Sequence, residues 1–505
     1  MRAIKICMAV ILLAAICFTV LVSCQTDGGN GDTVSNIENG ENVSNADPAV
    51  TEEEPEQVYP DLPAVNYEGY EFTFLYWGID SADWAEWDHR DFAMEELDGE
   101  LINDTVYNRN RKIEDKYNIT ITGTRVLHSE FNSVVTRAVN AGDDLYDVVA
   151  PQLYAFPPLA QNGNFIDWFS VPNLDLTMPW WDQGTIRDLS IINRLFVIQG
   201  CLLIVDNDSM EAMIFNKRVH QDQNLDDLYD IVKKGEWTFD KLYNMSKGVA
   251  QDLDGDGEMY IKDDLFGIIV QADTNVSFFV SGGEKIAAKD GNDLPVITFG
   301  SDRGYRITDI ISEIMLDEQN VVHLHRFEGQ FGIYDEQVKM MEEDRALFSW
   351  IRMRIVERLR GMETEFGILP LPKLDAVQEN YITHMNPHTG RGLSIPVTAS
   401  NLERTGMILE DLSAESRYTL QPAYYEINLR GKYTRDDESQ EMLDILLNNT
   451  AHDIGYVYNF GGFAGDTMLR HGQNKRSDYA SSFERVQQRM QQDIDRVVEA
   501  YETIQ

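Results

Sequence analysis

The chain of 505 residues contains little cysteine and little positive charge. Its 4 cysteines are too few for a disulfide framework in a chain of this length. Its 42 Lys and Arg face 85 Asp and Glu, which gives a formal net charge of −43. A surface this negative repels phosphate backbones, so the charge excludes a role in nucleic-acid binding. It also disfavours strongly anionic ligands unless basic residues gather locally.

The sequence also lacks the common catalytic motifs. It has no nucleophile elbow, no metalloprotease motif and no phosphate-binding loop. His384 and His388 have the spacing of a helical zinc pair, but Pro387 argues against a helix there. An enzyme, such as a surface carbohydrate-active enzyme, is therefore the weaker alternative, because it rests only on an abundance of carboxylates.

Beyond the N-terminus no hydrophobic run is long enough to cross a bilayer. The N-terminus itself has a short basic start and an apolar stretch over residues 9–22, which is typical of a secretory signal. The following residues 21–24, Leu-Val-Ser-Cys, resemble the bacterial lipobox. That resemblance implies removal of residues 1–23 and acylation of Cys24, for example by palmitate, which would anchor the protein at the outer face of the cell membrane. Only Cys201 then remains as a second cysteine, so no internal disulfide is expected.

Residues 24–66 are rich in Gly, Asn, Ser and acidic residues, and Gln25 to Pro60 contains no Lys or Arg. Such a segment buries too little apolar surface to order itself, so we expect a disordered acidic tether. The rest of the chain has ordinary globular composition, with 43% hydrophobic and 25% charged residues. It is too long for a single core, which predicts two lobes.

Strand-like and helix-like patterns alternate along the first part of the chain, which predicts an α/β fold. Continuous or β-branched apolar runs indicate strands at 71–77, 119–126, 145–150, 212–216 and 266–270. Helical periodicity indicates helices at 99–117, 128–141 and 238–251, the second of them ended by Gly142. From Leu402 onward the pattern is mainly helical.

The sharpest chemical motif is an acidic loop at residues 252–263. Oxygen-bearing side chains at loop positions one, three, five and twelve, with Gly257 at position six, match the spacing that binds Ca²⁺. The loop has Asp at its twelfth position, where an EF-hand has Glu, and in this it is similar to a dockerin loop; a dockerin, however, would carry two. We expect a structural Ca²⁺ site, and the alternative is an acidic turn without metal. The predicted ligands are Asp252, Asp254, Asp256, Glu258, Tyr260 and Asp263.

Several stretches together resemble family 1 of the extracellular solute-binding proteins of bacterial ABC importers, in particular its long lipoproteins from Gram-positive bacteria. The similar segments are 99–104, 107–110, 114–117, 146–149, 159–163, 213–217, 236–242 and 366–373. The resemblance implies a two-lobe periplasmic-binding-protein-like fold of type II, with hinge-linked lobes whose central sheets are flanked by helices. It also implies a monomer that delivers a solute, most often a sugar or oligosaccharide, to a membrane permease.

We expect the N-terminal lobe to contain residues 67–205 and about 335–378. The C-terminal lobe then contains residues 206–334 and about 379–505. A sensory co-receptor that binds a solute without importing it stays open as an alternative, because the sequence does not separate the two.

Sugars need aromatic platforms and polar hydrogen-bond partners, and ligands of open α/β sheets bind beyond the carboxyl ends of strands. Aromatic and polar residues follow several predicted strands, and two more lie in a loop after Pro179. The alternative interpretation of each Trp is core packing. The predicted solute-binding residues are Trp77, Trp84, Trp87, Gln152, Tyr154, Trp181, Asp182 and Trp350.

Overall fold

The computed structural model describes residues 57–78, 89–429 and 437–504. The predicted signal peptide, the lipidated Cys24 and most of the tether lie outside the described residues, as do Trp84 and Trp87. Residues 57–66, predicted to belong to the tether, are described, and they contact the folded part of the chain. The backbone N–H of Val58 donates to the Tyr418 hydroxyl at 3.0 Å, and the Tyr59 ring lies 5.2 Å from the Tyr418 ring.

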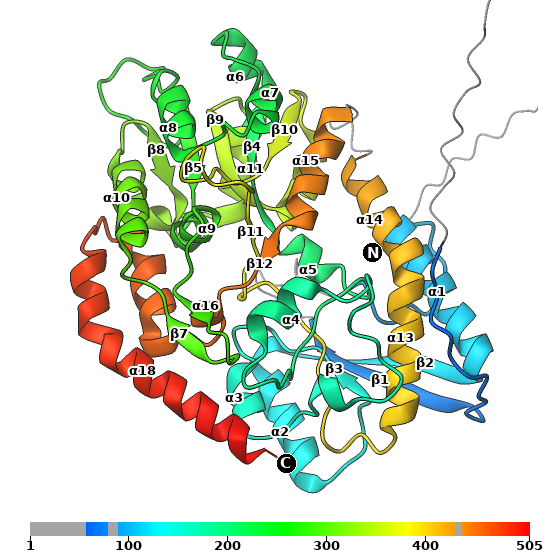
Figure 1. Ribbon diagram of the computed structural model, residues 1–505. Helices are drawn as coiled ribbons and strands as arrows, with labels where there is room; N and C mark the ends of the chain where they lie inside the picture. The colour runs from blue at the N-terminus through cyan, green and yellow to red at the C-terminus, as the bar shows by residue number, and fades with distance from the viewer. Residues whose placement is uncertain (1–56, 79–88, 430–436, 505) are drawn as a thin grey trace, which may run out of the picture. The chain divides into compact units, whose positions relative to one another are not determined.

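A parallel three-stranded sheet organises the first lobe (Figure 1). Its strands are β1 (Tyr70–Trp77), β2 (Ile119–Val126) and β3 (Val148–Val149), in the order β2-β1-β3. The helices between them are α1 (Leu101–Tyr117) and α2 (Phe131–Ala141), and Gly142 ends α2 in the left-handed conformation with a φ of 72°. The predicted elements are confirmed here, except that β3 is shorter than the predicted strand 145–150.

A five-stranded mixed sheet organises the second lobe, in the order β10-β4-β9-β5-β8. Strands β5, β8 and β9 are parallel to one another, and β4 is antiparallel to β9 and β10. All residues of these strands are buried, as the continuous apolar runs predicted for a sheet covered on both faces. The strands are β4 (Glu211–Asn216), β5 (Phe266–Val270), β8 (Val321–His323), β9 (Ala346–Arg352) and β10 (Phe366–Leu369).

The structure corrects the predicted lobe boundaries in two places. Strands β9 and β10, inside the segment 335–378, pair with β4 and so belong to the second sheet and not to the N-terminal lobe. Residues 390–396, predicted to lie in the C-terminal lobe, run antiparallel beside the end of β3, where Ser394 pairs with Val149. Helices α13 (Leu402–Tyr418) and α14 (Leu420–Leu429) then pack on α1. The chain therefore passes between the two lobes more often than the predicted division, with two segments in each lobe, allows.

The remaining elements cover the sheets or connect them (Figure 1). Two short strand pairs are β6 (Ala287–Lys289) with β7 (Pro295–Ile297) and β11 (Thr383–His384) with β12 (Thr450–Ala451). The last third is mainly helical, as predicted. The other helices are α3 (Pro157–Gln161), α4 (Gln183–Leu189), α5 (Val205–Asp208), α6 (Lys217–Asp222), α7 (Leu228–Lys233), α8 (Phe239–Lys247), α9 (Thr274–Ser281), α10 (Asp302–Leu316), α11 (Ile333–Glu342), α12 (Met353–Val356), α15 (Asp437–Asn448), α16 (Ile454–Val457), α17 (Leu469–Gln473) and α18 (Tyr479–Thr503).

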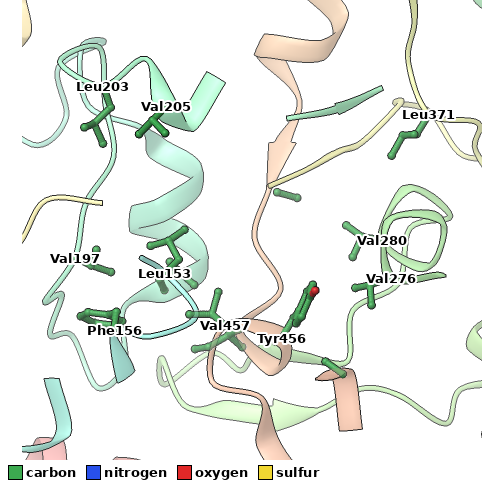
Figure 2. Packing of buried hydrophobic residues seen from close by; sticks show 14 of the residues in the cluster. Leu153, Phe156, Val197, Leu203, Val205, Val276, Val280, Leu371, Tyr456 and Val457 are labelled. Atoms are coloured by element: carbon green, nitrogen blue, oxygen red, sulfur yellow. The ribbon is translucent and has the colours of Figure 1, made fainter. Parts of the chain in front are cut away.

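One large cluster of buried hydrophobic side chains continues from the first lobe into the second. In Figure 2, Tyr456 and Val457 of α16 lie between Leu153, which follows β3, and Val276 of α9. Short helix α16 therefore contributes to the packing that joins the lobes. Over the described residues, no helix combines the length and the apolar character needed to span a membrane.

Ion pairs also join the two lobes. Arg90 lies next to Asp91, whose carboxylate accepts the backbone N–H of Ile204 at 2.8 Å. The Arg90 guanidinium reaches Asp208 at 3.3 Å and Glu357, which follows α12, at 3.1 Å. These carboxylates hold the pKa of Arg90 above its ordinary value in spite of burial. The pairs fix α5 and α12 side by side.

Candidate functional site

Three of the predicted solute-binding residues have structural contacts instead of an open face. Trp181 is buried, and its Nε1 donates to Glu410 Oε2 at 2.8 Å. Asp182 caps the N-terminus of α4, where its side chain accepts from Thr185. Trp350 is fully buried in β9, and its Nε1 donates to Ser277 Oγ at 3.2 Å. For Trp181 and Trp350, the alternative interpretation of core packing describes their place in the fold. Asp182 is a helix-capping residue.

Three other predicted residues gather at the carboxyl edge of the first sheet. Trp77 ends β1, and its ring lies 4.6 Å from the His128 ring. Gln152 follows β3; its Oε1 lies 3.2 Å from His128 Nε2, and its Nε2 donates to the His388 carbonyl. The Tyr154 ring lies 3.9 Å from the His388 ring. Contacts through His128 and His388 therefore connect Trp77, Gln152 and Tyr154.

The same His388 lines a cavity of about 470 Å³ at the carboxyl edge of the second sheet. The first residues after β5 and β8 and the last residue of β9 contribute to its wall, and α17 closes one side. This is the position in which open α/β sheets bind their ligands. The lining residues are Gln271, Ala272, Asp273, His325, Glu328, Ile333, Tyr334, Arg352, His388, Thr389, Gly465, Leu469, Arg470 and Gln473.

An ion pair between Asp273 and Arg352 fixes the floor of the cavity. Arg352 Nη2 lies 2.7 Å from Asp273 Oδ2, and Asn386 Nδ2 donates to Asp273 Oδ1 at 2.9 Å. Arg352 lowers the pKa of Asp273 far below its usual range, against the opposing effect of burial. Arg352 also donates to the Tyr334 hydroxyl. Because each charge has a partner, the floor is a rigid, nearly neutral surface of hydrogen-bonding groups.

Two neutral imidazoles add hydrogen-bonding groups to the wall. Burial lowers the pKa of His388 to about 4, and burial lowers the pKa of His325 as well, so both are uncharged near pH 7. His325 Nδ1 accepts the backbone N–H of Ala272 at 3.2 Å, so its proton is on Nε2. His325 is therefore a fixed hydrogen-bond donor at the carboxyl end of β8.

Some buried polar atoms of the wall have no protein partner. His388 Nε2 and Thr389 Oγ1 are both buried and accept or donate no hydrogen bond within the described part of the chain. Leaving such an atom unpaired costs about 1–3 kcal/mol, so native structures keep it chiefly where a ligand or water completes it. The wall at residues 388–389 is thus chemically incomplete until a polar molecule occupies the cavity.

A buried network below the floor connects the cavity to the crossing segments. Glu211, the first residue of β4, is fully buried. Its Oε2 lies 2.7 Å from His384 Nδ1, and its Oε1 accepts from Asn386 Nδ2 at 2.7 Å. Asn386 thus bonds both Glu211 and Asp273, so β11 and the segment that follows it are held against the second sheet.

Another hollow, of about 580 Å³, lies at the opposite edge of the second sheet. Lys217, Asp344 and Glu365, which line it, follow β4 or precede β9 and β10. This is the amino edge of the parallel strands, and its lining is exposed and charged. The carboxyl-edge cavity is smaller, but it has the enclosed polar groups and neutral histidines of a binding site, so we take it as the candidate site.

The acidic loop at 252–263 brings together three of its predicted metal ligands. Carboxylate oxygens of Asp252, Asp254 and Asp256 lie within 4.8 Å of one another. The Asp252 carboxylate accepts the backbone N–H groups of Gly255 at 2.6 Å and Gly257 at 2.8 Å, which lowers its pKa. Both glycines have a positive φ, 78° and 89°, as the sharp turn requires.

The other predicted metal ligands, Glu258, Tyr260 and Asp263, are not part of this group of three carboxylates, although the loop was expected to bind through position twelve. The neighbouring Asp264 is buried instead, and it accepts the backbone N–H groups of Leu253 at 2.8 Å and Tyr260 at 2.6 Å. Asp264 therefore closes the loop by hydrogen bonds, whereas Asp263 is exposed.

Sequence reasoning missed most of the cavity. Asp273 lies three residues beyond β5, His325 lies two residues beyond β8, and Arg352 ends β9, so the strand-end rule that selected Trp77 would also have selected them. The prediction selected mainly tryptophans and therefore omitted these three residues. His388 and Thr389 lie on an irregular segment, and its return to the cavity follows only from the tertiary fold.

No protein-family model matches the chain, and no curated protein matches it. Solved structures do match. A cyclo/maltodextrin-binding protein complexed with maltotetraose has a TM-score of 0.55 at 12% identity, covering 85% of this chain and 99% of that chain. The chain has the fold of the ABC-transporter solute-binding proteins. The ABC substrate-binding protein Lmo0181 from Listeria monocytogenes, in complex with cycloalternan, has a TM-score of 0.52 at 9% identity and covers 86% and 99%.

The same binding-protein fold occurs with a different kind of ligand. UgpB from Mycobacterium tuberculosis, in complex with glycerophosphocholine, has a TM-score of 0.52 at 15% identity, covering 78% of this chain and 95% of that chain. At identities this low, the likeness shows a shared fold, here the predicted two-lobe α/β architecture. It does not identify the ligand, because one fold hosts many ligands.

Proposed function

We propose that this protein is a solute-binding protein that binds a sugar or oligosaccharide in the carboxyl-edge cavity and delivers it to an ABC importer permease. The observation that carries this proposal is the chemistry of the cavity wall. A paired Asp273 and Arg352, a neutral His325 and the unpaired Thr389 hydroxyl offer donors and acceptors without a dominant charge. Sugar hydroxyl groups, which both donate and accept, complement such a wall.

The structural neighbours support the same assignment. Two of them are described with maltotetraose and with cycloalternan, both of which are oligosaccharides. Both of these are described as binding proteins, which favours a receptor over the glycosidase alternative. We propose that acylation of Cys24 holds the protein at the outer face of the membrane and that residues 25–56 serve as its tether.

The unpaired hydroxyl of Thr389 gives a direct test. Thr389→Val removes the hydroxyl and keeps the shape of the side chain, so the stability of the ligand-free protein should not fall, because no protein hydrogen bond is lost. Solute affinity should fall by about tenfold, the value of roughly 1.4 kcal/mol for one hydrogen bond. Affinity is measured by calorimetry with the glycan that gives the largest thermal shift in a panel of sugars, peptides and polyamines.

Thr308→Val is the matched control. Thr308 is equally buried, but its hydroxyl donates to the Tyr305 carbonyl at 2.9 Å and lies in α10, outside the cavity lining. This variant should lose stability and keep its affinity. A peptide or polyamine that shifts the melting curve, with no response to any glycan, would overturn the assignment of a sugar.

We also propose that the loop at 252–263 binds a structural Ca²⁺. Three carboxylates within 4.8 Å supply hard oxygen ligands, and the turn at Gly257 lets backbone carbonyls approach the same centre. A bound Ca²⁺ would neutralise the repulsion between these carboxylates, and through Asp264 it would stabilise the connection between α8 and β5. Its role would be structural, because the loop lies outside the lining of the carboxyl-edge cavity.

Chelation tests the calcium proposal. Adding a chelator to the purified protein should lower its melting temperature, and excess Ca²⁺ should restore it, because the ion binds the native state. Asp254→Asn should abolish this response. Asp290→Asn is the control, since Asp290 also accepts backbone N–H groups of its own exposed turn but belongs to no carboxylate cluster among the described residues. A melting temperature unaffected by chelator and Ca²⁺ would refute the proposal.

A further inference from the structure

A buried guanidinium with unused donors lies at the carboxyl edge of the first sheet. Arg391 is fully buried, and its guanidinium carbon lies 3.7 Å from the centre of the Trp77 ring. Its Nη1 donates to the carbonyls of Thr389 and Gly390. Its Nε and Nη2, and the Nε1 of Trp77, are buried without a hydrogen-bond partner among the described residues. Three unsatisfied donors and no acceptor therefore come together at one place.

No carboxylate in the described part of the chain forms an ion pair with Arg391. Burial lowers the pKa of Arg391 well below its ordinary value, and the charge of Asp91 opposes this effect without direct contact. A buried charge is normally paired or hydrogen-bonded through all its donors, because desolvation is costly. In a protein that closes two lobes around its solute, an unpaired buried group is expected where the solute supplies the missing partner.

The free donors have the geometry of a fork. Nε and Nη2 lie along the same edge of the planar guanidinium, and their two N–H groups on that edge are parallel, which matches the two oxygens of a carboxylate. The opposite edge, Nη1, is already used by backbone carbonyls. The unused edge of Arg391 thus fits a planar oxyanion better than a single hydroxyl.

Contacts connect this fork with the wall of the carboxyl-edge cavity, although Arg391 is not one of the lining residues. Arg391 is two residues beyond Thr389, which lines the cavity with its own unpaired hydroxyl. Gln152 bonds the His388 carbonyl on one side and approaches His128 on the other, and the His128 ring contacts Trp77. A chain of contacts therefore leads from His388 in the cavity wall to the Trp77 ring, over which the guanidinium of Arg391 lies.

We propose that the solute is an acidic oligosaccharide whose sugar carboxylate is bound by Arg391 beside Trp77, while its neutral hydroxyl-bearing part occupies the cavity. This inference rests on the proposed function. A singly charged carboxylate also suits the surroundings better than a phosphate ester, because the chain carries a net charge of −43 and repels a dianion more strongly. Arg391 supplies the local positive charge that an anionic ligand of such a protein requires.

Calorimetry with matched ligands tests the proposal. The probes are uronic-acid oligosaccharides of several linkages, each paired with its methyl ester, which keeps the sugar and removes the charge. The preferred acid should bind the wild-type protein at least about tenfold more tightly than its ester, as expected for charged hydrogen bonds. A sulfated oligosaccharide is included to distinguish a sulfate from a carboxylate, and tighter binding of the sulfate would overturn the choice of carboxylate.

Variants then assign the preference to Arg391. Arg391→Gln should bind acid and ester equally, and Arg391→Lys, which keeps the charge and loses the fork, should retain only part of the preference. Arg404→Gln is the control, because Arg404 is also buried over an aromatic ring, that of Tyr70, but it pairs with Asp147 at 3.2 Å and lies outside the cavity lining; it should keep the preference for the acid. Thermal denaturation without ligand shows that each variant is folded, and the comparison of wild-type acid and ester binding does not depend on any variant.

The outcomes separate the inference from the proposed function. Wild-type protein that binds neutral glycans or esters as tightly as acids refutes the acidic solute and leaves the sugar-binding function standing. A preference for the acid that survives in Arg391→Gln refutes the role of Arg391. A protein that responds to no glycan, acidic or neutral, refutes both.

Discussion

A buried carboxylate on α13 gives a prediction that can be worked out quantitatively. Glu410 is 1% exposed; its Oε2 accepts the Nε1–H of Trp181 at 2.8 Å, and its Oε1 accepts the backbone N–H of Asp175 at 3.3 Å. Burial is the largest effect on its titration, and these hydrogen bonds offset it only in part. The pKa of Glu410 is consequently raised from 4.5 to about 7.

The sign of the effect on stability follows from this shift. The folded state holds the Glu410 proton more tightly than the unfolded state, so protonation stabilises the fold. This stabilisation is complete below pH 4.5, decreases as the pH rises toward 7, and is absent above that. A shift from 4.5 to about 7 corresponds to roughly 3 kcal/mol, since one pKa unit is worth about 1.4 kcal/mol.

Glu410→Gln imitates the protonated acid, because its amide oxygen can still accept from Trp181. The variant should equal the wild type in free energy of unfolding near pH 4.5 and exceed it by about 2–3 kcal/mol at pH 8. Urea denaturation across this range, followed by tryptophan fluorescence, measures the difference. Glu403→Gln, at an exposed position of the same helix, is the control and should show no such trend. A difference between Glu410→Gln and wild type that does not change with pH would refute the reasoning.

Two further predictions concern the core and the anchor. Trp350→Ala should cost about 3–5 kcal/mol of unfolding free energy, because its ring is fully buried and its Nε1 donates to Ser277; a loss below about 1 kcal/mol in urea denaturation would contradict this. Cys24→Ser should prevent acylation and release the protein from the membrane fraction of producing cells, as followed by immunoblotting; membrane retention equal to wild type would argue against the lipid anchor.

The fold was predictable because its main strands are continuous apolar or β-rich runs that can be recognised in the sequence. The continuous apolar run Phe266–Val270 became the interior strand β5 of the second sheet, and the β-rich run that ends at Trp77 became β1. The lobe boundaries were not predictable in the same way. Strand β9 is 130 residues from β4 in sequence, from 346 back to 216, and only its antiparallel register with β4 places it in the second sheet.

The candidate site was predicted only in part, because residue type says little about which face a side chain uses. Trp181 and Trp350 were chosen as sugar platforms, yet each has a protein partner for its indole N–H and lies in the core. Trp77 was chosen by the same rule, and its Nε1 has no partner. Hydrogen-bond satisfaction, which a sequence does not show, is what distinguishes these three buried tryptophans.

The acidic composition and the position of Arg391 are parts of one argument about selectivity. A chain with twice as many acidic as basic residues repels anions at long range, so most anionic solutes are rejected before contact. Screening limits this repulsion to about 8–10 Å at physiological salt, and a guanidinium enclosed beside Trp77 acts only within hydrogen-bonding distance. A solute that brings a single carboxylate to the fork gains two charged hydrogen bonds there, whereas a polyanion meets the repulsion of the surface along its whole length. The combination thus selects for a carboxylate presented on a largely neutral, hydroxylated molecule, which is the chemistry that the wall of the carboxyl-edge cavity also favours.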